Sequence, residues 1–259
     1  MSLPCTAIVL VHRDTPTLWN SLHSLDWLDT IIVIDNNSQI APERFTAASV
    51  TSIHPISDNF TDFAAVRNDS MLLVTTPWCF FLDSDEVVDP MSSESLASLE
   101  DAMQNQHCAA LSCRRSDVFL GKKLRFGEAG RQTLIRFLRI NQAHWMGIAH
   151  ENPVVSGGIQ RSQVALTHYS HESIKSFIED VSVYAKIIGS SKMSSRTQNL
   201  WQLLFFPPLK LLYDLSILGG LLDGWRGITY SYCMALHSLL VRIYYYEKSS
   251  RLVSRTTTA

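Results

Sequence analysis

Residues 79–86 read CFFLDSDE, four apolar residues followed by two aspartates that a single serine separates. The apolar run predicts a buried strand that ends at the acidic pair. Alternate side chains of an extended chain point to the same side, so Asp83 and Asp85 project together while Ser84 points away. Two neighbouring carboxylates suit Mg²⁺ or Mn²⁺, hard cations that share oxygen ligands with substrate phosphate. The motif therefore predicts a phosphate- or diphosphate-bearing substrate, with a solvated turn before a helix as the alternative.

The residues before this motif predict a parallel α/β arrangement. Apolar strands are expected at residues 6–11 and 30–34, and between them a helix at 16–25 with Thr15 as its N-cap and Pro16 at its first position. Strand, helix and strand within some thirty residues indicate a βαβ unit. Open α/β sheets bind ligands beyond the carboxyl ends of their strands, which is where the acidic pair is expected.

The same periodicities extend over the rest of the first 170 residues. We expect strands at 50–53, 79–82, 109–114, 118–124 and 132–139, helices at 62–74 and 92–106, and a polar loop at 150–153.

The composition is that of an ordinary globular protein with one main domain and an appendage: 259 residues, 46% hydrophobic, 18% charged and a net charge of −2. Near-neutrality argues against nucleic acid as a partner. From residue 186 onward nine Lys and Arg face three Asp and Glu, a surplus of +6 that leaves −8 for residues 1–185. A basic tail of this kind predicts an anionic membrane surface as partner, or packing against the chain's own acidic body.

The cysteines and the N-terminus bear on the compartment. The five cysteines form no CxxC pair, which argues against zinc and a disulfide framework, and Cys79 and Cys233 lie in apolar runs typical of a core. The first residues lack a charged segment before a short apolar stretch, so no signal peptide is expected. We expect a cytoplasmic protein.

Residues 171–259 are predicted to be helical, and 200–246 are rich in apolar and aromatic residues interrupted by Pro207-Pro208 and by glycines. The longest uncharged stretch, 227–241, has 15 residues, short of the roughly 20 that span a membrane. In the last helix one face is expected to hold Ile228, Tyr232, Ala235, Leu236, Leu239, Leu240 and Ile243, with Ser231, His237, Ser238 and Arg242 outside it. Such helices, with Trp201, Trp225 and tyrosines 244–246 as anchors, predict peripheral attachment to the cytoplasmic membrane face. Packing on the sheet or another subunit is the alternative.

Taken together, several motifs resemble glycosyltransferase family 2 enzymes with a GT-A fold, and among them glucosyl- and heptosyltransferases of the lipopolysaccharide-core type. The matching pieces are IIVIDNNS at 31–38, FAAVRN at 63–68, FLDSDE at 81–86, IRFLR at 135–139, AHE at 149–151, HYS at 168–170 and LDGWRG at 222–227. The resemblance implies an α/β GT-A catalytic domain at residues 1–170 that binds nucleotide-sugar and acceptor, followed by an amphipathic helical region at 171–259.

Donor-side roles follow from the resemblance. Asp35 would hold the nucleotide base and Arg67 would lie near the nucleotide. Asp83 would contact ribose or metal and Asp85 the metal, while His168 would reach the metal or diphosphate. The residues alone leave alternatives: an Asx turn for Asp35, an ion pair with Asp69 or another acid for Arg67, and a structural hydrogen bond for His168.

The implied reaction is an inverting transfer from a nucleoside-diphosphate sugar, in the first place a UDP-sugar, to an acceptor hydroxyl of a glycan or lipid-linked substrate in envelope or lipopolysaccharide synthesis. Mn²⁺ or Mg²⁺ would stabilise the leaving diphosphate. A carboxylate must accept the proton of the hydroxyl. Glu151 is the expected base and Glu128 its competitor, although either residue can instead pair with Arg131, Arg136 or Arg139.

The chain departs from the family at His12-Arg13-Asp14, where a Pro-Thr-Tyr-Asn-Glu-like turn is usual, and at Asn37-Ser38-Gln39, which replaces Ser-Thr-Asp. Both departures predict an unusual nucleotide pocket. A nucleotidyltransferase would need a glycine-rich phosphate loop after the first strand, and residues 11–19 contain no glycine. A non-catalytic scaffold of the same fold is the other rival, and the intact acidic pair argues against it.

Overall fold

The computed structural model describes residues 3–56, 62–147, 151–171, 173–191 and 196–256. The chain forms two compact units. The first comprises Met1–Ser116 and Gln132–Tyr169, and the second comprises Asp117–Arg131 and Ser170–Ala259. One division between the units falls after Tyr169, and a segment from the middle of the chain groups with the C-terminal helices.

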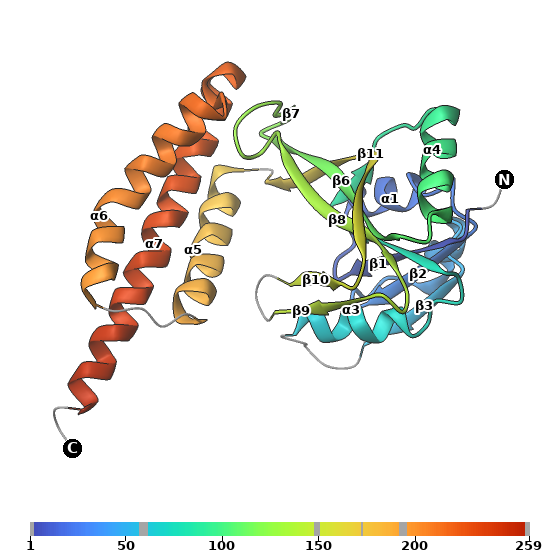
Figure 1. Ribbon diagram of the computed structural model, residues 1–259, viewed down its shortest axis with the longest axis horizontal. Coiled ribbons are helices and arrows are strands. Elements are labelled where there is room, and N and C mark those ends of the chain that lie inside the picture. Colours follow the sequence, from blue (N-terminus) through green and yellow to red (C-terminus); the bar gives the residue numbers. More distant parts are fainter. Residues whose placement is uncertain (1–2, 57–61, 148–150, 172, 192–195, 257–259) are drawn as a thin grey trace. The chain divides into compact units, whose positions relative to one another are not determined.

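Four parallel strands form one half of the main sheet in the first unit (Figure 1): β1 (Cys5–Val11), β2 (Thr30–Asp35), β3 (Ser52–Pro55) and β4 (Trp78–Asp83). Val11 lies opposite Asp35, and Leu10 lies opposite Asp83. The carboxyl ends of β1, β2 and β4 therefore meet at one edge, which brings the acidic pair and Asp35 to the same side of the sheet.

Three helices join these strands, α1 (Pro16–His23), α2 (Pro42–Ala47) and α3 (Phe63–Met71), and α4 (Ser93–Gln104) follows β5. The Thr15, Asp62 and Ser92 side chains accept hydrogen bonds from backbone N–H groups of the first turns of α1, α3 and α4. The short α2 was not expected from the sequence, since its six residues are too few to show a period.

The other half of the sheet is antiparallel, and the whole order is β3-β2-β1-β4-β8-β6-β11-β5, with β7 (Lys122–Lys123) beside β6. The added strands are β5 (Glu86–Val88), β6 (Cys108–Phe119), β8 (Gln132–Arg139) and β11 (Gly158–His171). Two strands were predicted at 109–114 and 118–124, and this is wrong: one twelve-residue strand passes through the predicted break because Arg114 and Arg115 still pair with Thr133 and Gln132 of β8.

A small second sheet pairs β9 (Ala143–Met146) with β10 (Asn152–Val155). The expected polar loop at 150–153 is therefore wrong in its last two residues, because Asn152 and Pro153 belong to β10 and pair with β9. Residue 150 of that prediction lies outside the described part of the chain.

The core lies on both faces of the sheet. In β4, Trp78, Phe80 and Leu82 pack on one side, and Cys79 and Phe81 pack in a separate cluster on the other. This alternation follows the two-residue period of a strand and explains why CFFL is apolar at every position.

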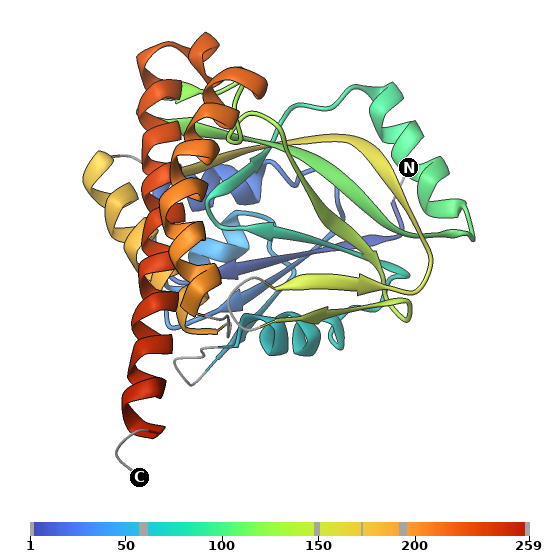
Figure 2. The ribbon, with the colours of Figure 1, turned by 60° about the vertical axis from the view of Figure 1, so that its left-hand side comes forward.

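The helices of the second unit are α5 (Ile174–Ser191), α6 (Arg196–Leu212) and α7 (Trp225–Thr256), and a π-helical turn at Tyr213–Ile217 and a 3₁₀ turn at Gly220–Asp223 join α6 to α7. The long α7 packs against both α5 and α6 (Figures 1 and 2). Pro207 and Pro208 do not interrupt the helix as expected but lie inside α6. In the described residues no helix is long and apolar enough to cross a membrane.

The predicted face of the last helix is wrong in part. Ser231 and Ser238, expected outside the apolar face, are buried, whereas Tyr232 and Ile243 are exposed. The reason is that α7 has neighbours on two sides, so small residues lie where α5 and α6 approach and no single apolar stripe defines its contacts.

Candidate active site

The acidic pair stands at the end of β4, and its two carboxylates have different partners. One Asp83 oxygen accepts a hydrogen bond from Arg67 Nη2 at 2.7 Å, and the other accepts one from Arg136 Nη2 at 2.8 Å. Each oxygen of Asp83 thus has its own guanidinium partner. The side chain is fixed between two arginines, which come from α3 and β8.

Arg67 links Asp83 to Glu151. Its Nε donates to Glu151 Oε1 at 3.2 Å, and its guanidinium lies 4.7 Å from the ring centre of Trp145 and 5.3 Å from that of Phe81. Arg67 is buried, so the alternative of a surface pair on α3 is replaced by an ion pair with acids from two distant strands or loops. The tertiary fold, and not helix spacing, selects these partners.

The ion-pair chain continues beyond Asp83 to two residues for which the sequence predicted no role. Arg136 also donates to Glu86, and Arg115 Nη1 donates to the same Glu86 oxygen at 3.1 Å. Glu86 is fully buried, and such a carboxylate is stable only when it is paired. The available signal was an acid directly after the DSD motif, but its partners lie 29 and 50 residues away.

Charge and burial act in opposite directions on the acidic pair. Burial raises the pKa of Asp83, but the charges of Arg136 and Arg67 and their hydrogen bonds outweigh it and hold that pKa well below its usual range. The pKa of Asp85 is lowered as well, since the hydrogen bond and charge of His168 outweigh desolvation. Both aspartates are therefore ionised at neutral pH.

Asp85 and His168 lie together although 83 positions separate them. His168 Nε2 is 3.4 Å from Asp85 Oδ2. The pairing of β11 with β5 brings them together: His168 lies opposite Glu86, and the Tyr169 N–H donates to the Asp85 carbonyl at 2.8 Å. The Asp85 side chain is 49% exposed and is reachable by a ligand.

The donor atoms fit a divalent cation that the substrate helps to hold. Among the described residues no group of three His, Cys, Asp or Glu side chains forms a complete metal site. Asp85 and His168 supply one carboxylate and one imidazole, whereas the oxygens of Asp83 are engaged by arginines. Mg²⁺ commonly binds through one or two protein ligands together with water and substrate phosphate, so two ligands suffice.

Two buried guanidinium N–H groups belong to the same cluster. Arg67 Nη1 and Arg136 Nε have no hydrogen-bond partner among the described residues. A buried donor without a partner costs free energy. Both atoms are buried inside the ion-pair cluster, so in this structure they are unpaired donors next to Asp83 and are not exposed to a ligand.

Asp35 lies at the carboxyl end of β2, where the sequence placed it. One of its oxygens accepts the Ser38 N–H at 2.9 Å, and Asn37 has a φ of 54°. The bond closes the loop after the strand as the alternative expected, but it reaches the third residue on, whereas an Asx turn reaches the second. This bond and a contact with a nucleotide base are compatible, because the Ser38 bond uses one of the two carboxylate oxygens.

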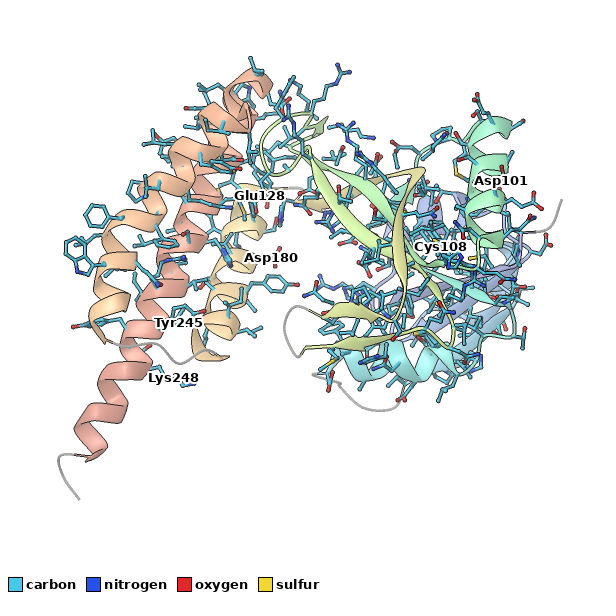
Figure 3. The ribbon with its side chains drawn as sticks, in the orientation of Figure 1. Asp101, Cys108, Glu128, Asp180, Tyr245 and Lys248 are labelled. Atoms are coloured by element: carbon cyan, nitrogen blue, oxygen red, sulfur yellow. The ribbon has the colours of Figure 1, made fainter. Side chains whose placement is uncertain are left out.

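The two candidate bases fall in different units. Glu151 shares Arg67 with Asp83 in the first unit, while Glu128, labelled in Figure 3, belongs to the second and forms an ion pair with Lys210. Glu151 therefore joins the ion-pair cluster around the acidic pair.

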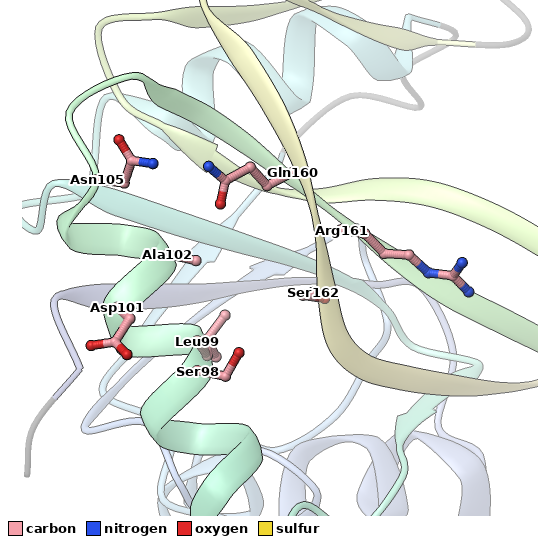
Figure 4. A pocket seen from close by; sticks show the side chains of 8 residues that line it. All are labelled: Ser98, Leu99, Asp101, Ala102, Asn105, Gln160, Arg161 and Ser162. Carbon is pink, nitrogen blue, oxygen red and sulfur yellow. The ribbon is translucent and has the colours of Figure 1, made fainter.

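A separate hollow of about 260 Å³ lies between α4 and β11 (Figure 4). Ser98, Asp101 and Gln160 are among its lining residues, and none of the candidate site residues lines it. It takes no part in the site described above.

Comparisons with known proteins bear on the enzyme class. No model of a protein family matches the chain. The lipopolysaccharide core biosynthesis glycosyltransferase LpsC of Rhizobium meliloti (strain 1021) is 19% identical over 247 residues, which cover 90% of this chain and 91% of LpsC.

Solved structures with a similar trace include S. aureus TarS 1–349 in complex with UDP-GlcNAc, at 12% identity and a TM-score of 0.44, covering 98% of this chain and 92% of that one. In a longer TarS structure the chain covers 45% of the TarS chain. Glucosyl-3-phosphoglycerate synthase from Mycobacterium tuberculosis with Mg²⁺ and UDP matches at 13% identity and a TM-score of 0.44, covering 71% and 76% of the two chains. The parallel-to-antiparallel sheet confirms the expected α/β GT-A fold, and the similarity to LpsC along nine-tenths of the chain confirms the expected resemblance to glycosyltransferases and the enzyme class that it implies.

Proposed function

We propose that the protein transfers a sugar from a nucleoside-diphosphate sugar, in the first place a UDP-sugar, to an acceptor hydroxyl with inversion and with the help of Mn²⁺ or Mg²⁺. The observation that carries the proposal is the pairing of Asp85 with His168 at a strand end, directly beside a buried cluster of arginines. Cation ligands and guanidinium donors together match a metal-bound diphosphate.

On the donor side, Asp85 and His168 hold the cation, which acts as a Lewis acid on the leaving diphosphate when bound. Arg67 and Arg136 place their guanidinium groups beside the same strand end. Asp83 holds these two guanidiniums in position, and Asp35, at the end of β2 on the other side of β1, receives the nucleotide base. This arrangement favours departure of an anion from the sugar carbon.

On the acceptor side, we assign Glu151 as general base. Its carboxylate is linked to Asp83 through a single guanidinium, so base and leaving-group side belong to one rigid network. A base that takes the acceptor proton allows direct displacement, which inverts the sugar carbon without a covalent intermediate.

The acceptor is proposed to be a glycan or a lipid-linked molecule of the cell envelope, modified at the cytoplasmic membrane surface. The name of LpsC, which refers to lipopolysaccharide core biosynthesis, supports an envelope substrate. The basic surplus of the C-terminal region supports work beside an anionic membrane.

The first test is calorimetric binding of UDP with and without Mn²⁺. We expect Mn²⁺ to tighten binding of UDP to the wild-type protein, and Asp85→Ala to abolish that gain because it removes the carboxylate ligand. Asp69→Ala is the matched control, an exposed acid on α3 whose loss leaves the metal effect intact. Equal tightening of UDP binding by Mn²⁺ in Asp85→Ala would refute the metal assignment.

The second test is turnover of UDP-sugars with an envelope glycan extract, followed by NMR of the product anomer. Release of UDP with an inverted anomer supports the transfer. Tight nucleotide binding without any turnover supports the rival scaffold, and release of pyrophosphate from a nucleoside triphosphate and a sugar phosphate supports a nucleotidyltransferase.

A further inference from the structure

The outward side of α6 is apolar over its described length. Residues at helical spacing, Trp201, Leu204, Phe205, Leu209 and Leu212, are each about half exposed or more, with Trp201 at 61%. We call these five residues the α6 face. They recur every three to four positions, so they lie along one side of the helix, and the Trp201 and Phe205 rings stack at 5.2 Å. Exposed apolar surface of this extent marks a site of interaction.

The acids of this region point inward. Asp214 and Asp223, which follow α6, are 2% and 4% exposed. Asp214 accepts the Glu128 N–H at 2.6 Å, and Asp223 accepts the N–H groups of Arg125 and Phe126 at 2.9 Å each. Both carboxylates accept backbone hydrogen bonds in the interior. They therefore add no negative charge to the surface around the α6 face.

This burial increases the positive excess on the surface of the C-terminal region. Of its three acids after residue 186 two are buried, so Glu247 is the one acid left to face nine Lys and Arg. An apolar strip that carries aromatic rings and lies in a cationic region is what an anionic bilayer attracts.

We propose that the α6 face lies in the interfacial layer of an anionic lipid bilayer. A second copy of the chain is a weaker occupant, because two such surfaces would bring two cationic regions together with Glu247 as the one exposed acid after residue 186 on each copy. A bilayer supplies both the apolar layer and the negative charge, and Trp201 has the amphipathic ring that prefers the headgroup level.

Docking has a consequence for the acceptor, and this consequence rests on the proposed transfer. The buried Asp214 and Asp223 clamp residues 125–128 onto the same helices, and Lys210 of α6 pairs with Glu128. Lys210 follows Trp201 by nine positions, about two and a half helical turns, so the Glu128 loop lies on the side of α6 opposite the α6 face. Docking would bring the enzyme to the surface at which lipids present their headgroups, which points to a lipid-linked acceptor.

The test is co-sedimentation of the full chain with phosphatidylglycerol vesicles and, separately, with phosphatidylcholine vesicles at low salt. We expect binding to phosphatidylglycerol, weaker binding to phosphatidylcholine, and a loss on the order of tenfold or more in Leu209→Asp, since each 1.4 kcal/mol is a factor of ten. Leu72→Asp is the matched control, an exposed leucine in the first unit, and we expect it to bind as the wild type does. Circular dichroism checks that both variants are folded.

A second measurement remains informative if Leu209→Asp does not fold. In Trp201→Phe the blue shift of tryptophan emission on adding phosphatidylglycerol vesicles is expected to shrink. Vesicle binding that Leu209→Asp leaves unchanged, an unaltered shift in Trp201→Phe, or a dimer in ultracentrifugation that Leu209→Asp dissociates would each overturn the proposal. UDP binding in the presence of Mn²⁺ is measured in parallel, so failure of docking is distinguished from failure of the proposed transfer.

Discussion

Arg67 is the residue that connects the two sides of the candidate site. Its guanidinium contacts Asp83 and Glu151 and lies over Trp145, so one side chain joins the end of β4 to the start of β10. A planar group with several fixed donors can serve two acids at once, which a lysine ammonium does less well. The two carboxylates proposed for donor and acceptor chemistry are therefore held in a fixed relation.

Removing the proposed base tests this relation at the residue scale. Glu151→Gln is expected to lower kcat on the order of 10²- to 10⁴-fold, because an amide cannot take up the proton of the substrate hydroxyl. The KM for the UDP-sugar is expected to change little. Steady-state kinetics with varied donor measure both constants.

Glu128→Gln is the matched control for that experiment, since Glu128 is an acid paired with Lys210 in the other unit. We expect it to retain most of the activity. A large loss of kcat in Glu128→Gln together with a small one in Glu151→Gln would reverse the assignment of the base.

At the scale of elements, strand pairing assembles the site. The pairing of β5 with β11 places His168 next to Asp85. Strand β8 carries Arg136, which contacts both Asp83 and Glu86. Arg136 is buried, and the charges of Asp83 and Glu86 raise its pKa despite its desolvation. The ion pairs are therefore part of the packing between strands as well as of the site.

Arg136→Met is expected to destabilise the protein by about 3–5 kcal/mol, because it removes the arginine that Asp83 and Glu86 share and leaves each carboxylate with one arginine partner. The free energy of unfolding from urea titration measures this. Arg44→Ala is the control, since it removes an arginine–aspartate pair whose side chains are about half exposed. We expect the control to unfold at nearly the wild-type urea concentration, and an equal loss in both variants would contradict a structural role for the buried network.

At the scale of the whole molecule, the depressed pKa values of Asp83 and Asp85 link stability to pH. Both groups have a lower pKa in the folded chain than the value of about 3.9 in an unfolded one. As the pH falls, the unfolded chain takes up protons first. The stabilisation is thus complete at neutral pH and is lost below about pH 5.

We expect the urea midpoint of the wild-type protein to fall between pH 6 and pH 3.5, and Asp83→Asn to show a shallower fall because one of the linked groups is gone. Denaturation curves at several pH values measure the slope. A slope in Asp83→Asn as steep as in the wild type would show that other carboxylates account for the acid sensitivity.

Much of the fold was accessible from the sequence where signals are local. Strand β8 has its predicted bounds, and Thr15 caps α1 as expected. The five cysteines are free and buried, which confirms Cys79 and Cys233 as core residues. The predictions that failed depend on neighbouring elements: pairing with β8 keeps β6 a single strand, and contacts on two sides of α7 bury Ser231 and Ser238.

The candidate site divides in the same way. The sequence by itself determined the acidic pair, its place at a strand end and the α/β class, because alternation of side chains and the order of strands and helices are properties of neighbouring residues. Only the tertiary structure decided that Asp83 is held by two arginines while Asp85 meets His168, and that Glu86 and Arg115 extend the network. These contacts join residues from different strands and helices, and their partners are chosen by sheet register and burial, which no local pattern encodes.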